Sequence, residues 1–204
     1  MAVAIIPFYF YILYMNKPGK IVLIEGVWGA GKTTLIKNVI KKLNVTYIYI
    51  REPNHLIAKI SHKSANFITG WYFKAHERNL ERAYVFAHNG KVVLIERSPL
   101  SSVVFSRVYL NEKKDVEIRR FESYIKNIRD ISGIRTYLVY LKPRKIDSVI
   151  AIMEKKSYLK AFNKIKFFQA LDYQLRVAIQ KLEKENLILV LKNPTQESLI
   201  KLLK

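Results

Sequence analysis

One short segment limits what this chain can fold into more than any other part of its sequence. Residues Gly26 to Thr34 read G-V-W-G-A-G-K-T-T and match the pattern G-x-x-x-x-G-K-[S/T]. An apolar run, Ile21–Glu25, comes directly before the segment, and a helical pattern over Thr33–Leu43 follows it. This strand–loop–helix setting is what separates a phosphate-binding loop from a chance glycine-rich turn.

The chemistry of the loop predicts an ATP site. Its glycines allow backbone N–H groups to curl around phosphate oxygens, and the following helix adds the positive end of its dipole. Lys32 is expected to reach the β- and γ-phosphates, and the hydroxyl of Thr33 to bind Mg²⁺. The residues expected to bind ATP are Gly26, Val27, Trp28, Gly29, Ala30, Gly31, Lys32, Thr33 and Thr34.

Apolar runs recur along the chain at regular intervals and predict the strands of a sheet. They are nearly continuous rather than alternating, which is typical of parallel strands buried on both faces. The runs are Ile21–Glu25, Thr46–Ile50, Val92–Glu96, Thr136–Leu141 and Leu187–Leu191. Segments with helical periodicity separate them, so the sequence predicts a doubly wound α/β fold.

The predicted domain is single and spans residues 20–204, because no linker, repeat or low-complexity tract interrupts the pattern. Two segments within it, Ser64–His88 and Lys155–Lys166, are rich in aromatic and charged residues and are candidates to face a substrate.

Residues 1–19 are predicted to be an apolar extension, with Met15 as the true start. The uncharged stretch Met1 to Tyr14 contains Pro7 and is shorter than the roughly 20 apolar residues that span a membrane. It also lacks the basic start of a signal peptide. We therefore expect no membrane partner, and a membrane-surface anchor is the alternative.

Cysteine is absent, which excludes disulfides, thiolate nucleophiles and cysteine-ligated zinc. A reducing, cytoplasmic location fits this composition.

The net charge of +20 predicts attraction to polyanions. Two interpretations remain open, a lysine-rich surface without a dedicated partner and a basic protein that binds nucleic acid and uses ATP as a switch. The lysines are scattered rather than gathered in a stripe, so we expect no dedicated nucleic-acid partner.

Charged pairs follow two of the predicted strands, where ligands gather in parallel sheets. The second strand is followed by Arg51 and Glu52, and the third ends at Glu96 and is followed by Arg97. Glu96 is placed as an acid that holds magnesium, and Arg97 has the planar fork that binds phosphate. Glu52 could accept the proton of an attacking hydroxyl.

Four blocks in this order make the chain resemble the thymidylate kinase and deoxynucleoside kinase superfamily over roughly residues 20–190. The blocks are I-E-G-V-W-G-A-G-K-T-T (Ile24–Thr34), R-E-P (Arg51–Pro53), E-R-N (Glu77–Asn79) and E-R-S-P-L-S-S (Glu96–Ser102). The resemblance implies a P-loop kinase fold with a five-stranded parallel sheet, helices on its faces and a short basic lid. It also implies transfer of the ATP γ-phosphate, with Mg²⁺, to a nucleotide or nucleoside.

The resemblance also implies roles for individual residues. Lys32, Arg97 and Glu52 would be catalytic, and Thr33 and Glu96 would hold the metal. The acceptor would be bound by Arg51, Glu52, Phe73, Arg78 and Arg97. Lysines would stand in the lid where relatives have arginines, at Lys155, Lys156 and Lys160.

The identity of the acceptor stays open between two classes. The R-E-P and E-R-N blocks favour a nucleoside monophosphate, above all dTMP, which would be converted to dTDP. Trp28, however, stands where thymidylate kinases usually carry an acid, and E-R-S is typical of deoxynucleoside kinases, in which the residue matched by Glu52 activates the sugar 5′-hydroxyl. Relatives are commonly homodimers, so a homodimer is expected by analogy.

Overall fold

The computed structural model describes residues 18–43, 46–54, 56–112, 115–143, 147, 149–151 and 165–204. Its centre is a five-stranded, wholly parallel sheet with the strand order β2-β3-β1-β4-β5. The strands are β1 (Lys20–Glu25), β2 (Tyr47–Ile50), β3 (Val92–Glu96), β4 (Arg135–Tyr140) and β5 (Leu189–Lys192).

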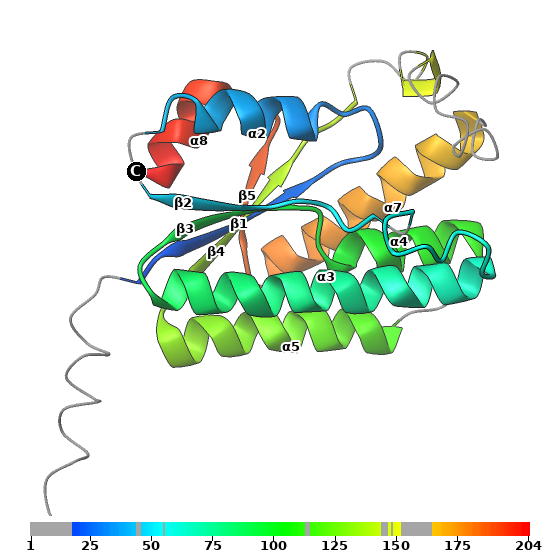
Figure 1. Cartoon of the computed structure of the whole chain (residues 1–204), viewed down its shortest axis with the longest axis horizontal. Coiled ribbons are helices and arrows are strands. Elements are labelled where there is room, and N and C mark those ends of the chain that lie inside the picture. Colours follow the sequence, from blue (N-terminus) through cyan, green and yellow to red (C-terminus); the bar gives the residue numbers. More distant parts are fainter. Residues whose placement is uncertain are drawn as a thin grey trace, which may run out of the picture.

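Helices cover both faces of the sheet (Figure 1). One face carries α2 (Lys32–Ile40) and α8 (Gln196–Leu203). The other face carries α3 (Ala65–His88), α4 (Pro99–Tyr109), α5 (Asp115–Ser132) and α7 (Ile165–Lys184). The sheet and its flanking helices confirm the predicted α/β fold class.

The two cores follow from the alternation of side chains along each strand. In β1, Ile21 and Leu23 belong to the core under α3, α4, α5 and α7, whereas Val22 and Ile24 belong to the core under α2 and α8. All four side chains are fully buried. Burial on both faces is why these strands are continuously apolar in sequence.

The predicted elements agree closely with the structure where it describes them. Each predicted strand lies within two residues of an observed one, and the segment Ser64–His88 forms α3. Ser64 caps this helix, since its Oγ accepts a hydrogen bond from the backbone N–H of Phe67 at 3.3 Å. The predicted lid lysines, and the predicted N-terminal extension up to residue 17, lie outside the described residues.

Across the described ranges, no helix combines the length and apolar character that crossing a bilayer requires.

Substitutions at a buried position and at an exposed position should differ in their effect on stability. Leu138→Ala in β4 removes a fully buried side chain and should lower the free energy of unfolding by about 2–5 kcal/mol. Ile131→Ala, at a position 81% exposed in α5, should change it by less than about 0.5 kcal/mol. Denaturant unfolding measures both, and equal effects would contradict the assigned core.

Candidate active site at the carboxyl edge of the sheet

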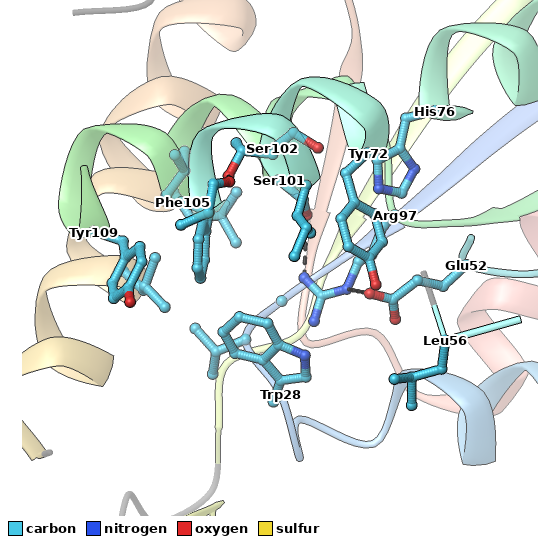
Figure 2. A pocket seen from close by; sticks show the side chains of 18 of the residues that line it. Trp28, Glu52, Leu56, Tyr72, His76, Arg97, Ser101, Ser102, Phe105 and Tyr109 are labelled. Atoms are coloured by element: carbon cyan, nitrogen blue, oxygen red, sulfur yellow. Dashed lines mark hydrogen bonds and ion pairs between the residues drawn. The ribbon is translucent and has the colours of Figure 1, made fainter. Parts of the chain in front are cut away.

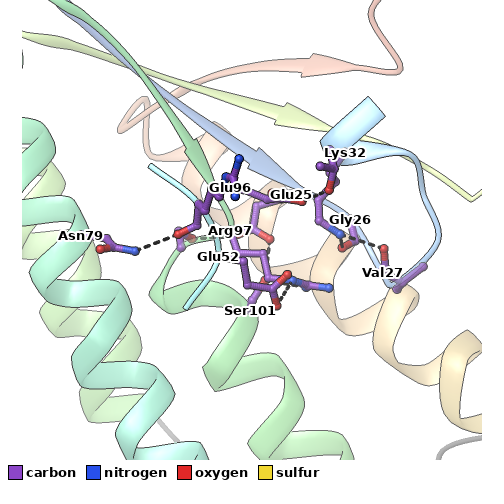
Figure 3. A network of polar contacts seen from close by, with 12 residues as sticks. Glu25, Gly26, Val27, Lys32, Glu52, Asn79, Glu96, Arg97 and Ser101 are labelled. Atoms are coloured by element: carbon purple, nitrogen blue, oxygen red, sulfur yellow. Dashed lines mark hydrogen bonds and ion pairs between the residues drawn. The ribbon is translucent and has the colours of Figure 1, made fainter. Parts of the chain in front are cut away.

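Three adjacent strands, β2, β3 and β1, deliver their last residues to the same edge of the sheet. β1 ends at Glu25 and leads into Gly26, β3 ends at Glu96 and leads into Arg97, and Glu52 follows β2 by two residues. Because β3 pairs with both β1 and β2 in parallel register, these residues converge (Figure 3). The edge is where parallel α/β sheets bind ligands.

The phosphate-binding loop needs glycine for steric reasons that the structure makes explicit. Gly26 has a φ of 145°, and a Cβ there would lie 2.5 Å from the carbonyl oxygen of Leu141. Gly31, with a φ of 88°, precedes α2 and provides no side-chain cap for it. The first turn of α2 also carries no acidic residue. The amides at this helix end therefore fit an anionic ligand such as phosphate.

Lys32 is folded back onto the loop that it is expected to serve. Its Nζ donates to the carbonyl oxygens of Gly26 at 3.0 Å and Val27 at 3.1 Å (Figure 3). Burial, and then the charge of Arg97, lower the pKa of Lys32 to about 7, although nearby carboxylates oppose the shift. The ammonium form is therefore costly in the absence of an anion.

Glu96 is held by two hydroxyl groups beside the loop. Thr33 Oγ1 donates to Glu96 Oε1 at 2.5 Å, and the Tyr49 hydroxyl donates to Oε2 at 2.5 Å. Burial and this bond to Glu96 raise the pKa of Tyr49, so it stays a donor. The paired oxygens of Thr33 and Glu96 fit Mg²⁺, a cation that takes few protein ligands and completes its shell with phosphates and water. Within the described residues, no group of three or more His, Cys, Asp or Glu could hold a metal.

Arg97 is the centre of the site and sits on an unusual backbone. Its φ is +68°, a left-handed conformation that is uncommon outside glycine and clusters at functional sites. The guanidinium is buried, with Nε 2.7 Å from Glu52 Oε1 and its carbon 5.1 Å from the centre of the Trp28 ring. Burial lowers the pKa of Arg97, but Glu52, Glu25 and Glu96 outweigh it and raise the pKa overall, so the guanidinium stays charged.

Glu25 is a member of the site that sequence reasoning missed. It is fully buried, and its two oxygens accept hydrogen bonds from Ser98 and Ser101, each at 2.6 Å. Ser101 Oγ also accepts a bond of 3.2 Å from Arg97 Nη1. Burial raises the pKa of Glu25, while Arg97, the two serines and Lys32 oppose that shift.

A cavity of about 420 Å³ opens beside the loop, and we call it the P-loop pocket. It lies between the loop, α3, α4 and α7, with Glu52 and Arg97 in its wall (Figure 2). Most of its remaining lining is aromatic or aliphatic, including Trp28, Tyr72, Phe105, Tyr109, Leu171 and Leu175. Such a pocket, with a few convergent polar groups, suits a small organic ligand with a flat ring.

The face of α3 that lines this pocket is not the one expected from sequence. Tyr72 and His76 line the P-loop pocket, whereas Phe73 and Arg78 line a second cavity of about 470 Å³ toward α5. At 3.6 residues per turn, neighbouring helical residues point about 100° apart, and here Tyr72 faces the P-loop pocket while Phe73 faces the second cavity. The structure therefore does not bring Phe73 and Arg78 together with Arg97. Arg51 is exposed and lines neither cavity.

His76 is a second residue that sequence reasoning missed. It is buried, stacks on Tyr72 at 5.9 Å, and its Nδ1 has no hydrogen-bond partner among the described residues. Burial, and then Arg97, lower the pKa of His76 to about 3, so the ring is neutral. The spacing of Tyr72 and His76, one helical turn apart, was a usable sequence indication that they share a face.

Comparison with known families settles the family of this chain. The model of the KAP family P-loop domain matches residues 4–199. The chain belongs to the KAP P-loop family. No curated protein matches this KAP-family chain.

Solved structures share the fold of this KAP domain. A deoxyadenosine kinase from M. mycoides, solved with the products dCMP and a flexible dCDP, is 18% identical with a TM-score of 0.58, and the match covers 89% of this chain and 95% of that one. Thymidylate kinase from Candida albicans is 14% identical with a TM-score of 0.59, and the match covers 91% and 89%. These likenesses confirm the nucleotide-kinase fold that the sequence resemblance implied.

Because the pKa of Lys32 is lowered, we expect the affinity of the KAP domain for its expected ligand, ATP, to depend on pH. A bound polyphosphate stabilises the ammonium form, so binding should take up a proton once the pH exceeds about 7. ATP affinity should therefore fall as the pH rises from about 7 to about 9. Calorimetry in buffers of different ionisation enthalpy measures this uptake. Proton release, or affinity that does not change with pH, would contradict the assignment.

Proposed function

We propose that this KAP-family chain transfers the γ-phosphate of ATP to the 5′-hydroxyl of a deoxynucleoside bound in the P-loop pocket. The observation that carries the proposal is the Glu52–Arg97 ion pair, which joins the phosphate-binding loop to an otherwise mainly apolar and aromatic pocket. A carboxylate at that junction is where an acceptor hydroxyl needs a base.

The donor half of the site supports ATP as the phosphate source. The loop and the start of α2 would bind the phosphates, and Lys32 would leave the carbonyl groups of Gly26 and Val27 to reach them. Thr33 and Glu96 would hold Mg²⁺, which neutralises charge on the transferred group when bound. The M. mycoides deoxyadenosine kinase has also been solved with bound dATP, and that structure is 19% identical to this chain with a TM-score of 0.54.

On the acceptor side, we assign the proton transfer to Glu52. Its side chain is 30% exposed, so the carboxylate can meet a ligand in the pocket. The acceptor oxygen would form a bond to the γ-phosphorus as the bond from that phosphorus to the ADP oxygen breaks. Glu52 would take the hydroxyl proton, and Arg97 would stabilise charge on the phosphoryl group.

The charge around Arg97 favours a neutral acceptor over a monophosphate. Glu52, Glu25 and Glu96 all act on this guanidinium, so its charge is already compensated before a ligand binds. Arg78, expected to add positive charge at the acceptor, lines the other cavity.

A nucleoside monophosphate, above all dTMP, is the second candidate acceptor. Lys63 favours it, because this lysine also lines the P-loop pocket and could meet an acceptor phosphate.

A panel of deoxynucleosides and their monophosphates, incubated with Mg-ATP and read by product mass, tests the proposal. We expect a nucleoside to gain one phosphoryl group, with ADP formed only when an acceptor is present. Glu52→Gln should lower kcat by about 10²–10⁴-fold, because general-base catalysis contributes that much. Lys32→Ala should abolish turnover.

Three outcomes would contradict the nucleoside proposal. Conversion of dTMP alone would establish the second candidate instead. ADP formation that ignores every acceptor would indicate a nucleoside triphosphatase. Absence of any product, with ATP binding intact, would exclude both kinase proposals.

Substitution of His76 should change the KM for the acceptor more than it changes the stability of the fold. His76→Leu removes a buried nitrogen that has no partner among the described residues, so the thermal midpoint should hold or rise. The same change removes a polar contact to the acceptor and should raise its KM by about tenfold, the worth of one hydrogen bond. Steady-state kinetics and thermal unfolding measure the two effects, and a loss of stability with unchanged KM would contradict this role.

A further inference from the structure

We propose that Glu25 is a positioning residue, which holds the Arg97 guanidinium against Glu52 through the hydroxyl of Ser101. The inference rests on the proposed function, because its purpose is to prepare the acceptor side for phosphoryl transfer. It gives a role to a buried carboxylate that lies at the base of the phosphate-binding loop and lines neither cavity.

The path from Glu25 to Arg97 is a continuous chain of hydrogen bonds. Ser101 Oγ donates its proton to Glu25 Oε2 at 2.6 Å and accepts a bond from Arg97 Nη1 at 3.2 Å (Figure 3). A serine that accepts from a guanidinium has its own proton free for the carboxylate, so the bond directions agree along the path. The hydroxyl thereby links the Glu25 carboxyl group to one specific nitrogen of Arg97.

Arg97 needs such a support because its other contacts leave one rotation open. Glu52 approaches Nε on one edge of the guanidinium, and the guanidinium carbon lies over the Trp28 ring (Figure 2). An ion pair at Nε and a contact with the Trp28 ring, which has no fixed donor and acceptor atoms, leave the guanidinium free to pivot about the contact with Glu52. A bond at Nη1 fixes that pivot, and a planar fork acts on phosphate only when its plane is set.

A purely structural role for Glu25 is the alternative, and the neighbouring serine separates the two. Ser98 Oγ donates to the other oxygen of Glu25 at the same distance of 2.6 Å, yet its further contact is the backbone N–H of Leu100, which it caps at the start of α4. Ser98 and Ser101 are therefore matched in their bond to Glu25 and differ in whether they reach Arg97.

The test is a crossed comparison of Ser98→Ala, Ser101→Ala and Ser101→Thr with Glu25→Gln. Ser101→Ala and Glu25→Gln should lower kcat with the best acceptor by roughly 10- to 100-fold, the effect of a small misplacement of a catalytic group. The ATP dissociation constant of Ser101→Ala should stay within about twofold of wild type, since the hydrogen bonds of Lys32 and Thr33 do not involve Ser101. Ser101→Thr keeps the hydroxyl and should restore kcat.

Ser98→Ala should show the reverse pattern. It removes the cap of α4 and should lower the thermal midpoint, with kcat within about twofold of wild type. If Ser98→Ala and Ser101→Ala lower kcat equally, or if Glu25→Gln leaves kcat unchanged, the positioning role is wrong.

The position of Arg97 can also be measured without an activity assay, so this proposal can be tested separately from the proposed function. Nitrogen-15 spectra of arginine side chains should show slowly exchanging guanidinium protons for the buried Arg97, identified by their loss in Arg97→Lys. These signals should broaden or exchange faster in Ser101→Ala and Glu25→Gln and persist in Ser98→Ala. If the Arg97 signals persist in all three variants, the proposal is wrong. If the signals are lost from Ser101→Ala and Glu25→Gln as expected but the protein has no kinase activity, the positioning role stands and the kinase assignment fails.

Discussion

The guanidinium of Arg97 lies almost completely out of solvent, and the rest of the site is arranged around that fact. A buried charge is strongly unfavourable unless partners surround it. Its partners come from three adjacent strands, since Glu25 ends β1, Glu96 ends β3 and Glu52 follows β2. The strand order β2-β3-β1 is what brings them to one point. The same burial explains why a left-handed backbone at Arg97 is tolerated, because the surrounding contacts determine its position.

Arg97 also joins the two halves of the site. On one side lies the phosphate-binding loop, which contributes Trp28 beneath the guanidinium. Trp28 packs edge-on against Phe105 of α4 and Phe168 of α7, so a loop residue becomes part of the wall of the neighbouring pocket. This packing gives a physical role to the position at which thymidylate kinases, as the sequence resemblance implies, carry an acid. An indole here adds apolar surface and no charge, in keeping with a neutral acceptor.

The sheet and the loop could be predicted from sequence because local pattern determines both. In β1 the residues Ile21 to Ile24 are all apolar because helices bury both faces of the sheet, and the loop glycines are required by backbone geometry. The face of α3 could not be predicted in the same way. One residue of error in register turns a helix by about 100°, which is the difference between Phe73 and Tyr72.

Contacts between distant residues were also beyond the sequence. Ser101 lies 76 positions from Glu25, and no spacing rule indicates that they meet. His76 reads locally as one more polar residue on a mixed helix, and only the folded chain shows it buried with an unpartnered nitrogen. Positions at which reasoning from the local sequence fails in this way are expected to be functional or strained sites.

Fluorescence of Trp28 tests most directly whether the P-loop pocket receives the acceptor. The sequence contains two tryptophans, Trp28 and Trp71, and only Trp28 lines this pocket, so a Trp71→Phe variant reports on Trp28 alone. Titration with deoxynucleosides in the absence of ATP should give a saturable change in emission for at least one of them, and Trp71→Phe should leave turnover intact. An unchanged Trp28 signal at acceptor concentrations that saturate turnover would contradict the account, because the acceptor would then bind elsewhere.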